Sequence, residues 1–270
     1  MGGYILDPTM PVLLRPDGAV QVGWDPRRAV LVRPPQGLTA GALAAMLRRL
    51  QTGQAPDEPG ARAALDNLLP ALIDARLVTR IPARPARTPT IRIHGRGPLS
   101  DLLLGALRCS SSRITHSGRP DAGAPREPTD LVVLADYLVC DPRLIRELHA
   151  TGIPHLPVRV RDGTGLVGPL VIPGVTSCLG CADLHRSDRD AAWPAVAAQL
   201  RDTVGGADRA TVLGTAALAL NQIDQVLRAV RGDAGHDADP PATLNTTLEF
   251  DVGAGTVLAR HWSRHPHCGC

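Results

Sequence analysis

The first eighty residues carry three short apolar runs followed by two amphipathic stretches. The segments PVLLRPDGAVQVG (11–23) and RAVLVR (28–33) place these runs around the turn signal Pro-Asp-Gly, which predicts three short strands. Four apolar side chains then recur at helical spacing: Leu43, Met46, Leu47 and Leu50. Thr39 before them and Gly53 after them are suitable cap residues, so the pattern predicts a helix between these two positions.

The second amphipathic stretch, residues 60–76, has the apolar spacing of a helix but contains Pro70. A proline either starts a new helix or kinks an existing one, and the sequence leaves both outcomes open. The segment RLVTRIP (76–82) then predicts a closing strand. Strands, helices and a closing strand within so short a segment predict a winged-helix-like α+β module over residues 1–82.

Residues 83–90 are rich in proline and arginine and have no apolar periodicity, which predicts a linker. After it, apolar runs alternate with amphipathic stretches, the order expected of a parallel sheet with helical crossovers. The predicted strands and helices are TIRIH (90–94), PLSDLLLGALR (98–108), SRITHS (112–117), DLVVLAD (130–136), DPRLIRELHATG (141–152) and IPHLPVRV (153–160). Residues 91–270 are therefore predicted to form a Rossmann-like α/β domain.

The last third of the chain has two further patterns. Residues 190–231 predict a long helical segment. The segment TLEFDVGAGTVLARHW (247–262) predicts a hairpin turned by Gly253-Ala254-Gly255.

Four of the six cysteines occur in two close pairs. Cys178 and Cys181 form a C-x-x-C, and Cys268 and Cys270 form a C-x-C. Thiolates at such spacing chelate one tetrahedral zinc ion, and four protein ligands make such a site structural. We expect a structural zinc site formed by these four cysteines. A histidine (His185, His265 or His267) in place of one cysteine and unconnected free thiols are the alternatives.

A glycine loop follows the first strand of the predicted α/β domain. Gly95, Gly97 and Ser100 occupy the positions of G-x-G-x-x-G, a pattern that brings the backbone close to a phosphate at a helix N-terminus. An acid that holds the ribose is expected about 20 residues further on. It is missing, since RITHSG ends in His116 and Ser117.

The glycine loop, TDLVVLAD (129–136), IPHLPVRV (153–160), GPLVIPGVTSCLGC (168–181) and the late cysteine pair together resemble the ThiF/MoeB-type ubiquitin-activating-like fold. With a winged-helix module in front, the chain resembles more specifically the ThiF-like partner proteins of YcaO cyclodehydratases. The resemblance implies a zinc held by two cysteine pairs, a homodimer, and binding of a precursor leader peptide in azole-forming natural-product pathways.

Composition changes this expectation at one point. All 29 basic residues are arginine and lysine is absent, so the phosphate-binding lysine of adenylating members is missing. Their ribose acid is missing as well, as the sequence RITHSG shows. We therefore expect a non-catalytic scaffold, without bound ATP, that presents the leader peptide to a YcaO-type cyclodehydratase. An active ATP-dependent adenylating enzyme and a winged-helix DNA-binding regulator are the alternatives.

We expect the leader peptide to add a strand to the small sheet of the N-terminal module, because such a sheet has an exposed edge. The predicted peptide contacts are Leu68, Leu72, Ile73, Arg76 and Arg80. For the apolar three, filling the module's core is the alternative. Six arginines and no acid lie between residues 76 and 96, which suits an acidic peptide or an enzyme surface more than nucleic acid. A solvated linker is the alternative, and it is the more common reason for such a run.

Charge and hydropathy narrow the setting. A net charge of +3 is too small to indicate a partner, and we expect neither nucleic acid nor a membrane. Hydrophobic runs stay below the roughly 18 residues that a membrane span needs. MGGYILDPTM has no basic region followed by an apolar stretch, so we expect a cytoplasmic protein.

Overall fold

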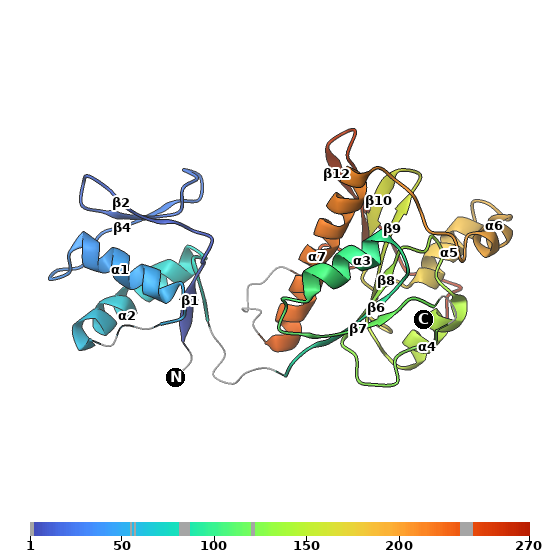
Figure 1. Ribbon diagram of the computed structural model, residues 1–270, viewed down its shortest axis with the longest axis horizontal. Coiled ribbons are helices and arrows are strands. Elements are labelled where there is room, and N and C mark those ends of the chain that lie inside the picture. The colour runs from blue at the N-terminus through green and yellow to red at the C-terminus, as the bar shows by residue number, and fades with distance from the viewer. Residues whose placement is uncertain (1–2, 55, 57, 81–86, 120–121, 233–239) are drawn as a thin grey trace. The chain divides into compact units, whose positions relative to one another are not determined.

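The computed structural model of the chain describes residues 3–54, 56, 58–80, 87–119, 122–232 and 240–270. The chain divides into two compact units, one over residues 1–86 and the other over most of residues 87–270. Figure 1 labels helices and strands of each unit.

The first unit is a small α+β module with two antiparallel sheets. Strands β2, β3 and β4 form a three-stranded meander, and β1 pairs with β5. The elements are β1 (Tyr4–Leu6), β2 (Val12–Leu14), β3 (Val20–Val22), β4 (Val30–Val32), α1 (Ala40–Leu50), α2 (Pro59–Asp74) and β5 (Val78–Arg80). The apolar faces of both helices and of the meander enclose one core, in which Leu6, Leu43 and Leu72 are fully buried.

The three strands, the first helix and the closing strand predicted from the sequence are present. The Oγ1 of Thr39 accepts a hydrogen bond from the N–H of Ala42 at 3.2 Å, so it caps α1 as predicted. Pro70 does not start a new helix, because α2 continues through it to Asp74. The described residues of this unit therefore hold two helices, and the pattern did not predict β1, which is only three residues long.

The second unit is built on a seven-stranded mixed sheet with the order β12-β11-β10-β9-β8-β6-β7. Strands β7, β6, β8 and β9 run parallel, and each neighbouring pair from β9 to β12 is antiparallel. The strands are β6 (Thr90–His94), β7 (Arg113–Ser117), β8 (Leu131–Ala135), β9 (His155–Arg161), β10 (Thr164–Val167), β11 (Thr246–Asp251) and β12 (Thr256–His261). This arrangement is that of a Rossmann-like α/β domain.

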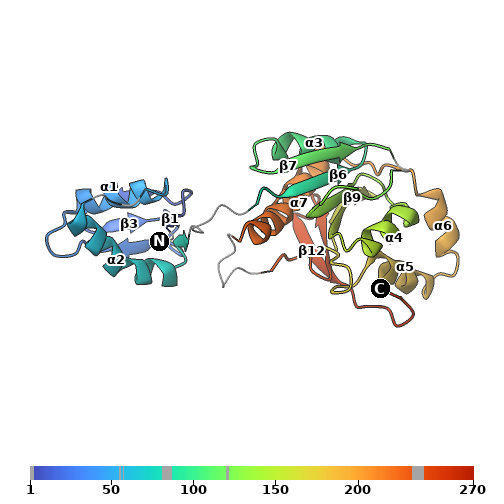
Figure 2. The same cartoon turned by 90° about the horizontal axis from the view of Figure 1, so that it is seen from below.

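Helices cover both faces of this sheet. Its helices are α3 (Pro98–Leu107), α4 (Pro142–Ala150), α5 (Leu179–Ser187), α6 (Trp193–Gln199) and α7 (Arg209–Arg231). The first core lies between the sheet and α3 with α7, and the second lies between the opposite face and α4 with α5 (Figure 2). No helix in the described ranges is both long and apolar enough to cross a bilayer.

The long helical segment predicted over residues 190–231 is divided in two. Helix α6 ends at Gln199, and α7 begins only at Arg209, where the carboxylate of Asp208 accepts the N–H of Thr211 at 3.0 Å. Between them, Gly205 lies so close to the sheet that a Cβ would stand 1.7 Å from the carbonyl oxygen of Val160. This close contact requires glycine, and it places residues 200–208 along the sheet in a non-helical conformation.

Candidate functional site: a cysteine cluster and a capped glycine loop

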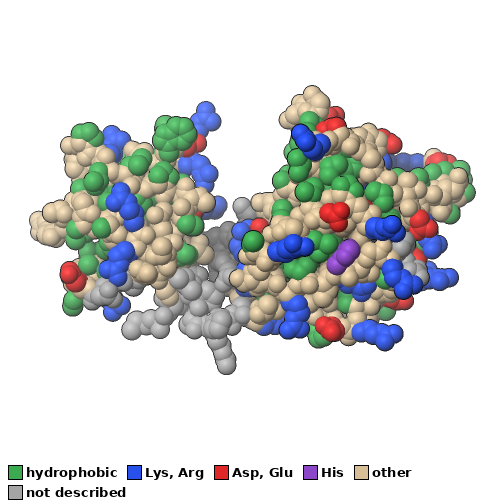
Figure 3. Space-filling view, viewed as in Figure 1, with side chains coloured by type: hydrophobic (Ala, Val, Ile, Leu, Met, Phe, Trp, Pro, Cys, Tyr) green, Lys and Arg blue, Asp and Glu red, His purple; other side chains and the backbone are tan. Residues whose placement is uncertain are grey.

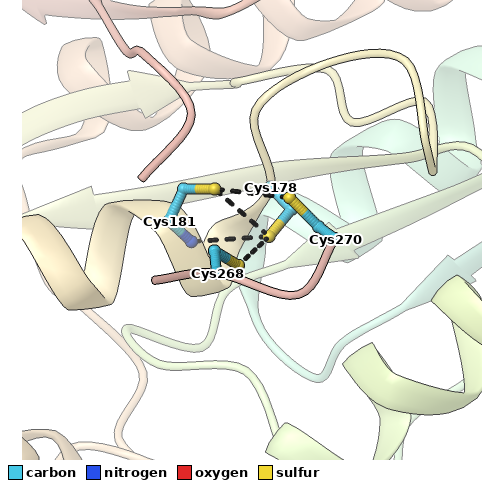
Figure 4. Close-up of side chains that lie close together, drawn as sticks. All are labelled: Cys178, Cys181, Cys268 and Cys270. Carbon is cyan, nitrogen blue, oxygen red and sulfur yellow. Dashed lines mark hydrogen bonds between the residues drawn. The ribbon is translucent and has the colours of Figure 1, made fainter. Parts of the chain in front are cut away.

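The four paired cysteines converge at one point of the larger unit (Figure 4). Cys178 is the N-cap of α5, where its Sγ accepts the N–H of Cys181 at 3.4 Å, so the C-x-x-C lies in the first turn of a helix. The C-terminal tail brings Cys268 within 3.6 Å of Cys178, and Cys270 within 3.5 Å of Cys181, measured between Sγ atoms.

The geometry of the four thiols suits a tetrahedral metal ion. With Zn–S bonds of about 2.3 Å, the ligand sulfurs of a tetrahedral zinc lie about 3.8 Å apart. Three of the Sγ–Sγ distances are 3.5, 3.6 and 3.8 Å, and all four sulfurs lie within 4.8 Å of one another. A disulfide would bring two of these sulfurs to about 2.05 Å, so the cluster has the spacing of a metal site and not of a crosslink. The cluster could therefore hold a metal ion such as zinc.

Burial and hydrogen bonding act oppositely on the two cysteines of α5. Burial raises the pKa of the Cys178 thiol well above its ordinary value. Burial also disfavours the thiolate of Cys181, but backbone hydrogen bonds from Cys178 and His265 outweigh it and lower its pKa to about 7. The thiolate, which is the form that binds metal, is thus already favoured at one position of the cluster.

A second set of contacts ties the C-terminal tail to α5. The buried imidazole of His265 contacts the carboxylate of Asp188 through Nε2 at 2.8 Å, and its Nδ1 accepts the N–H of His267 at 3.1 Å. His185 contacts the carbonyl oxygen of Ser263 at 3.2 Å. All four thiols are present in the cysteine cluster, and His185 and His265 instead group with Asp188. This arrangement favours four cysteine ligands over a histidine substitute.

The glycine loop leads from β6 into α3, and a buried carboxylate occupies the N-terminus of that helix. Asp136 directly follows β8, is 1% exposed, and accepts the N–H groups of Leu99 at 2.9 Å and Ser100 at 3.2 Å. The Oγ of Ser100 in turn accepts the N–H of Gly97 at 3.0 Å. The N–H groups that a helix N-terminus would offer to a phosphate are therefore bonded within the protein.

The same contact explains the two glycines of the loop. A Cβ on Gly95 would stand 2.5 Å from the carbonyl oxygen of Ala135, and a Cβ on Gly97 would stand 2.8 Å from the carboxyl group of Asp136. Glycine is needed here so that the loop can approach the end of β8. The glycine pattern indicates Gly95, Gly97 and Ser100 from the sequence, whereas Asp136 has no such local signal.

The predicted peptide-contacting residues have different surroundings. Leu72 is 1% exposed and Leu68 packs against the same core, whereas Ile73 is 42% exposed and Arg76 is exposed with a positive φ of 55°. Arg80 pairs with Tyr4 in the register of β5 and β1. The structure thus places Ile73 and Arg76 at the surface of the unit.

Two arginines of the arginine-rich stretch form an ion pair or a hydrogen bond with residues of the larger unit. Arg87 forms an ion pair with Asp130, and Arg92 donates to the carbonyl oxygen of Gly123 at 3.0 Å. Arg84 lies outside the described residues. On the face shown in Figure 3, basic side chains are scattered among apolar and uncharged ones. Arg87 and Arg92 are therefore bonded to groups of the larger unit.

No family model and no curated protein matches the chain. Solved structures do match along its entire length, among them the following three. A heterocyclase in complex with substrate and cofactor gives a TM-score of 0.67 at 15% identity and is covered over 39% of its own length. The heterocyclase TruD gives 0.65 at 16% and is covered over 42%. The Escherichia coli protein MccB, with ATP, gives 0.58 at 11% and is covered over 99%. The chain has the fold of these proteins.

The predicted resemblance is confirmed at the level of the fold. The match to MccB extends over almost all of both chains, whereas this chain spans about two-fifths of the two heterocyclases. Since all three sequence identities are low, the matches indicate the fold of this chain and not its activity. The activity has to be inferred from the residues of the site.

Proposed function

We propose that the chain is a non-catalytic partner protein that binds the leader segment of a precursor peptide and presents it to a YcaO-type cyclodehydratase during azole formation. The similarity in fold to two heterocyclases, one of them in complex with substrate and cofactor, supports a role in this chemistry. In this proposal residues 1–82 are the winged-helix-like recognition module, 83–90 the linker, and 91–270 a homodimeric scaffold with a structural zinc.

The single observation that carries the non-catalytic part is the Asp136 carboxylate at the start of α3. A nucleotide phosphate would compete for the N–H groups of Leu99 and Ser100 with a buried anion that already binds both. It would also meet that anion's negative charge at close range, in an interior where charge repulsion is strong. Together with the absence of lysine, this favours a glycine loop that serves packing and does not bind ATP.

For peptide recognition, β4 is the edge of the three-stranded meander that α1 covers less. At the other edge, α1 packs against β2, and Arg48 of α1 donates to the carbonyl oxygen of Val12 at 2.8 Å. Leu31, at the centre of β4, is 54% exposed. An added strand gains main-chain hydrogen bonds along an open edge, and an exposed apolar side chain beside that edge adds contact area. We therefore place the leader peptide on β4.

Fluorescence polarisation of a labelled leader peptide from the precursor encoded beside this gene tests the proposal. We expect Leu31→Asp in the full chain to weaken binding at least about tenfold, because a charge replaces buried apolar contact. Leu13→Asp is the matched control: Leu13 lies in the same cross-strand row, on β2, and should leave affinity within about twofold. Equal losses in both variants, or none in either, would refute binding at β4.

The adenylating alternative makes a different prediction. An active enzyme would release pyrophosphate when ATP, magnesium and the precursor peptide are supplied together. We expect no release above the level of a sample without the chain. Sustained release would replace the scaffold proposal with an enzymatic one, whatever the result of the peptide-binding assay.

A further inference from the structure

A large cavity lies in the second unit on the sheet face that α4 and α5 cover, opposite the face that carries α3. Its volume is about 670 Å³, within the range of small-molecule sites. The walls come from the loop after β8, from α4, α5 and α6, and from the end of β9. The cavity is therefore separate from the N-terminus of α3, and neither the cysteine cluster nor the peptide module accounts for it.

Most of the wall is apolar. Leu138, Ile145, Leu179, Pro194 and Ala197 contribute to it from four different segments. Trp193 closes one side, and the guanidinium of Arg186 stacks on its ring at 5.0 Å while it pairs with Asp183 at 2.9 Å. These contacts hold the entrance helix α6 to α5 and leave an apolar space behind it.

Five arginines and two acids line this apolar space. Arg186 pairs with Asp183, Arg201 lies 3.4 Å from Asp141, and Arg161 lies 3.8 Å from Glu249. Arg146 is exposed on α4, at the rim. The remaining one, Arg159 on β9, is half-buried and forms no ion pair with a carboxylate in the described part of the chain, and the charge of Asp183 acts on it only from a greater distance.

Arg159 is consequently a cation with unused hydrogen-bonding capacity. Among the described residues its one hydrogen bond runs from Nη1 to the carbonyl oxygen of Leu138 at 3.1 Å. A guanidinium carries five N–H donors, so most of them are left to solvent or to a ligand. Burial lowers the pKa of Arg159 from its ordinary value, which reflects the cost of holding this charge away from water. An anion in the cavity would offset that cost.

We propose that this cavity binds a carboxylate carried on an apolar body, with Arg159 as its anchor. The planar guanidinium fork matches a carboxylate in geometry, and one unpaired inner arginine balances one negative charge. A phosphate monoester carries close to two charges at neutral pH, and its second charge would be left to Arg146, which is exposed to water on α4. The acid can belong to a peptide side chain or to a small organic acid, since both present the same group.

Isothermal calorimetry on the full chain tests this with defined probes: octanoate, octanamide, octyl phosphate, and a capped peptide of two leucines and one aspartate with its asparagine counterpart. We expect at least one carboxylate to bind about tenfold more tightly than its amide, the difference made by one charge-assisted hydrogen-bonded pair. Tighter binding of the peptide acid identifies a peptide source, and tighter binding of octanoate a small acid.

Two variants assign the effect to the anchor. Arg159→Gln should abolish the preference for acid over amide, whereas Arg143→Gln, an exposed arginine on α4 outside the cavity, should preserve it. Arg159→Met should melt at the wild-type temperature or above it, because it removes a poorly compensated charge. For the wild-type chain, the proposal is overturned by equal affinity for acid and amide, by preference for octyl phosphate, or by absence of carboxylate binding at millimolar concentration. For the variants, it is overturned by a preference for acid that survives Arg159→Gln, or by a clear drop in the melting temperature of Arg159→Met.

Discussion

Replacing Cys181 by serine tests the proposed metal site most directly. Its thiol is fully buried, and its Sγ lies 3.8 Å from that of Cys178 and 3.5 Å from that of Cys270. Serine has nearly the same size but is a much poorer zinc ligand, so the substitution removes coordination while it preserves packing. Loss of the metal would also release the tail that the cluster holds against α5.

The expected loss of stability follows from the length of chain that the cluster closes. Cys178 and Cys268 are 90 residues apart in sequence, and a crosslink over such a loop removes about 4–5 kcal/mol of chain entropy from the unfolded state. For a unit of this size, each kcal/mol corresponds to about 2–4 °C in melting temperature. We therefore expect the larger unit of Cys181→Ser to melt about 8–20 °C below wild type.

Scanning calorimetry measures this melting temperature in the full chain, and mass spectrometry of protein purified without chelator counts the metal. We expect one zinc per chain in wild type and a melting temperature that EDTA lowers toward that of Cys181→Ser. Cys109→Ser is the matched control, since Cys109 is an exposed cysteine outside the cluster. Well under one zinc per wild-type chain, or equal melting of the two serine variants, would refute the reasoning.

Two further predictions concern buried ionisable groups. Asp136→Ala should destabilise the larger unit by about 2–4 kcal/mol in chemical denaturation, because two buried N–H groups lose their acceptor, while Asp101→Ala, at an exposed acid of the same helix, should cost far less. Burial lowers the pKa of His155 to about 4 from 6.5, so as the pH falls the unfolded chain binds a proton at this histidine before the folded chain does. The contribution of neutral His155 to the free energy of unfolding is therefore complete above pH 6.5 and is lost as the pH drops toward 4. Urea unfolding at several pH values measures this loss of stability, and we expect it to be about 2–3 kcal/mol smaller in His155→Gln than in wild type. The control His261→Gln, at an exposed histidine, should follow the wild-type pH profile. The same pH profile in His155→Gln and wild type would contradict the prediction.

The parallel part of the sheet was predictable most clearly at β8, which is a short apolar run bounded by turn residues. All five residues of β8 are buried, and such a strand is recognisable without knowledge of its neighbours. The division of the helix predicted over residues 190–231 could not be predicted from the sequence. It depends on the contact between Gly205 and Val160, residues that lie on different elements and meet only when the sheet has formed.

The cysteine cluster was predictable for a related reason. C-x-x-C spacing is local chemistry, and a pair of cysteines near the chain end has few uses in a packed core. The hydrogen bonds that hold the tail in place, such as the one between His265 and Asp188, connect residues 77 apart and have no local signal. The sequence therefore predicted which four cysteines come together but not the contacts that position two of them.

Asp136 shows most clearly where local patterns stop. In sequence it ends an apolar strand, a position where acids commonly face solvent or a ligand, and it stands 37 residues after Leu99, to which it binds. Only the parallel pairing of β6 with β8 brings the end of one strand beside the loop that follows the other. The glycine pattern is the same whether the loop approaches a phosphate or a carboxylate from its own chain, because both need backbone without a Cβ. In this chain the end of the neighbouring strand carries an acid that reaches the helix N-terminus, so the glycine pattern alone does not identify what the loop approaches.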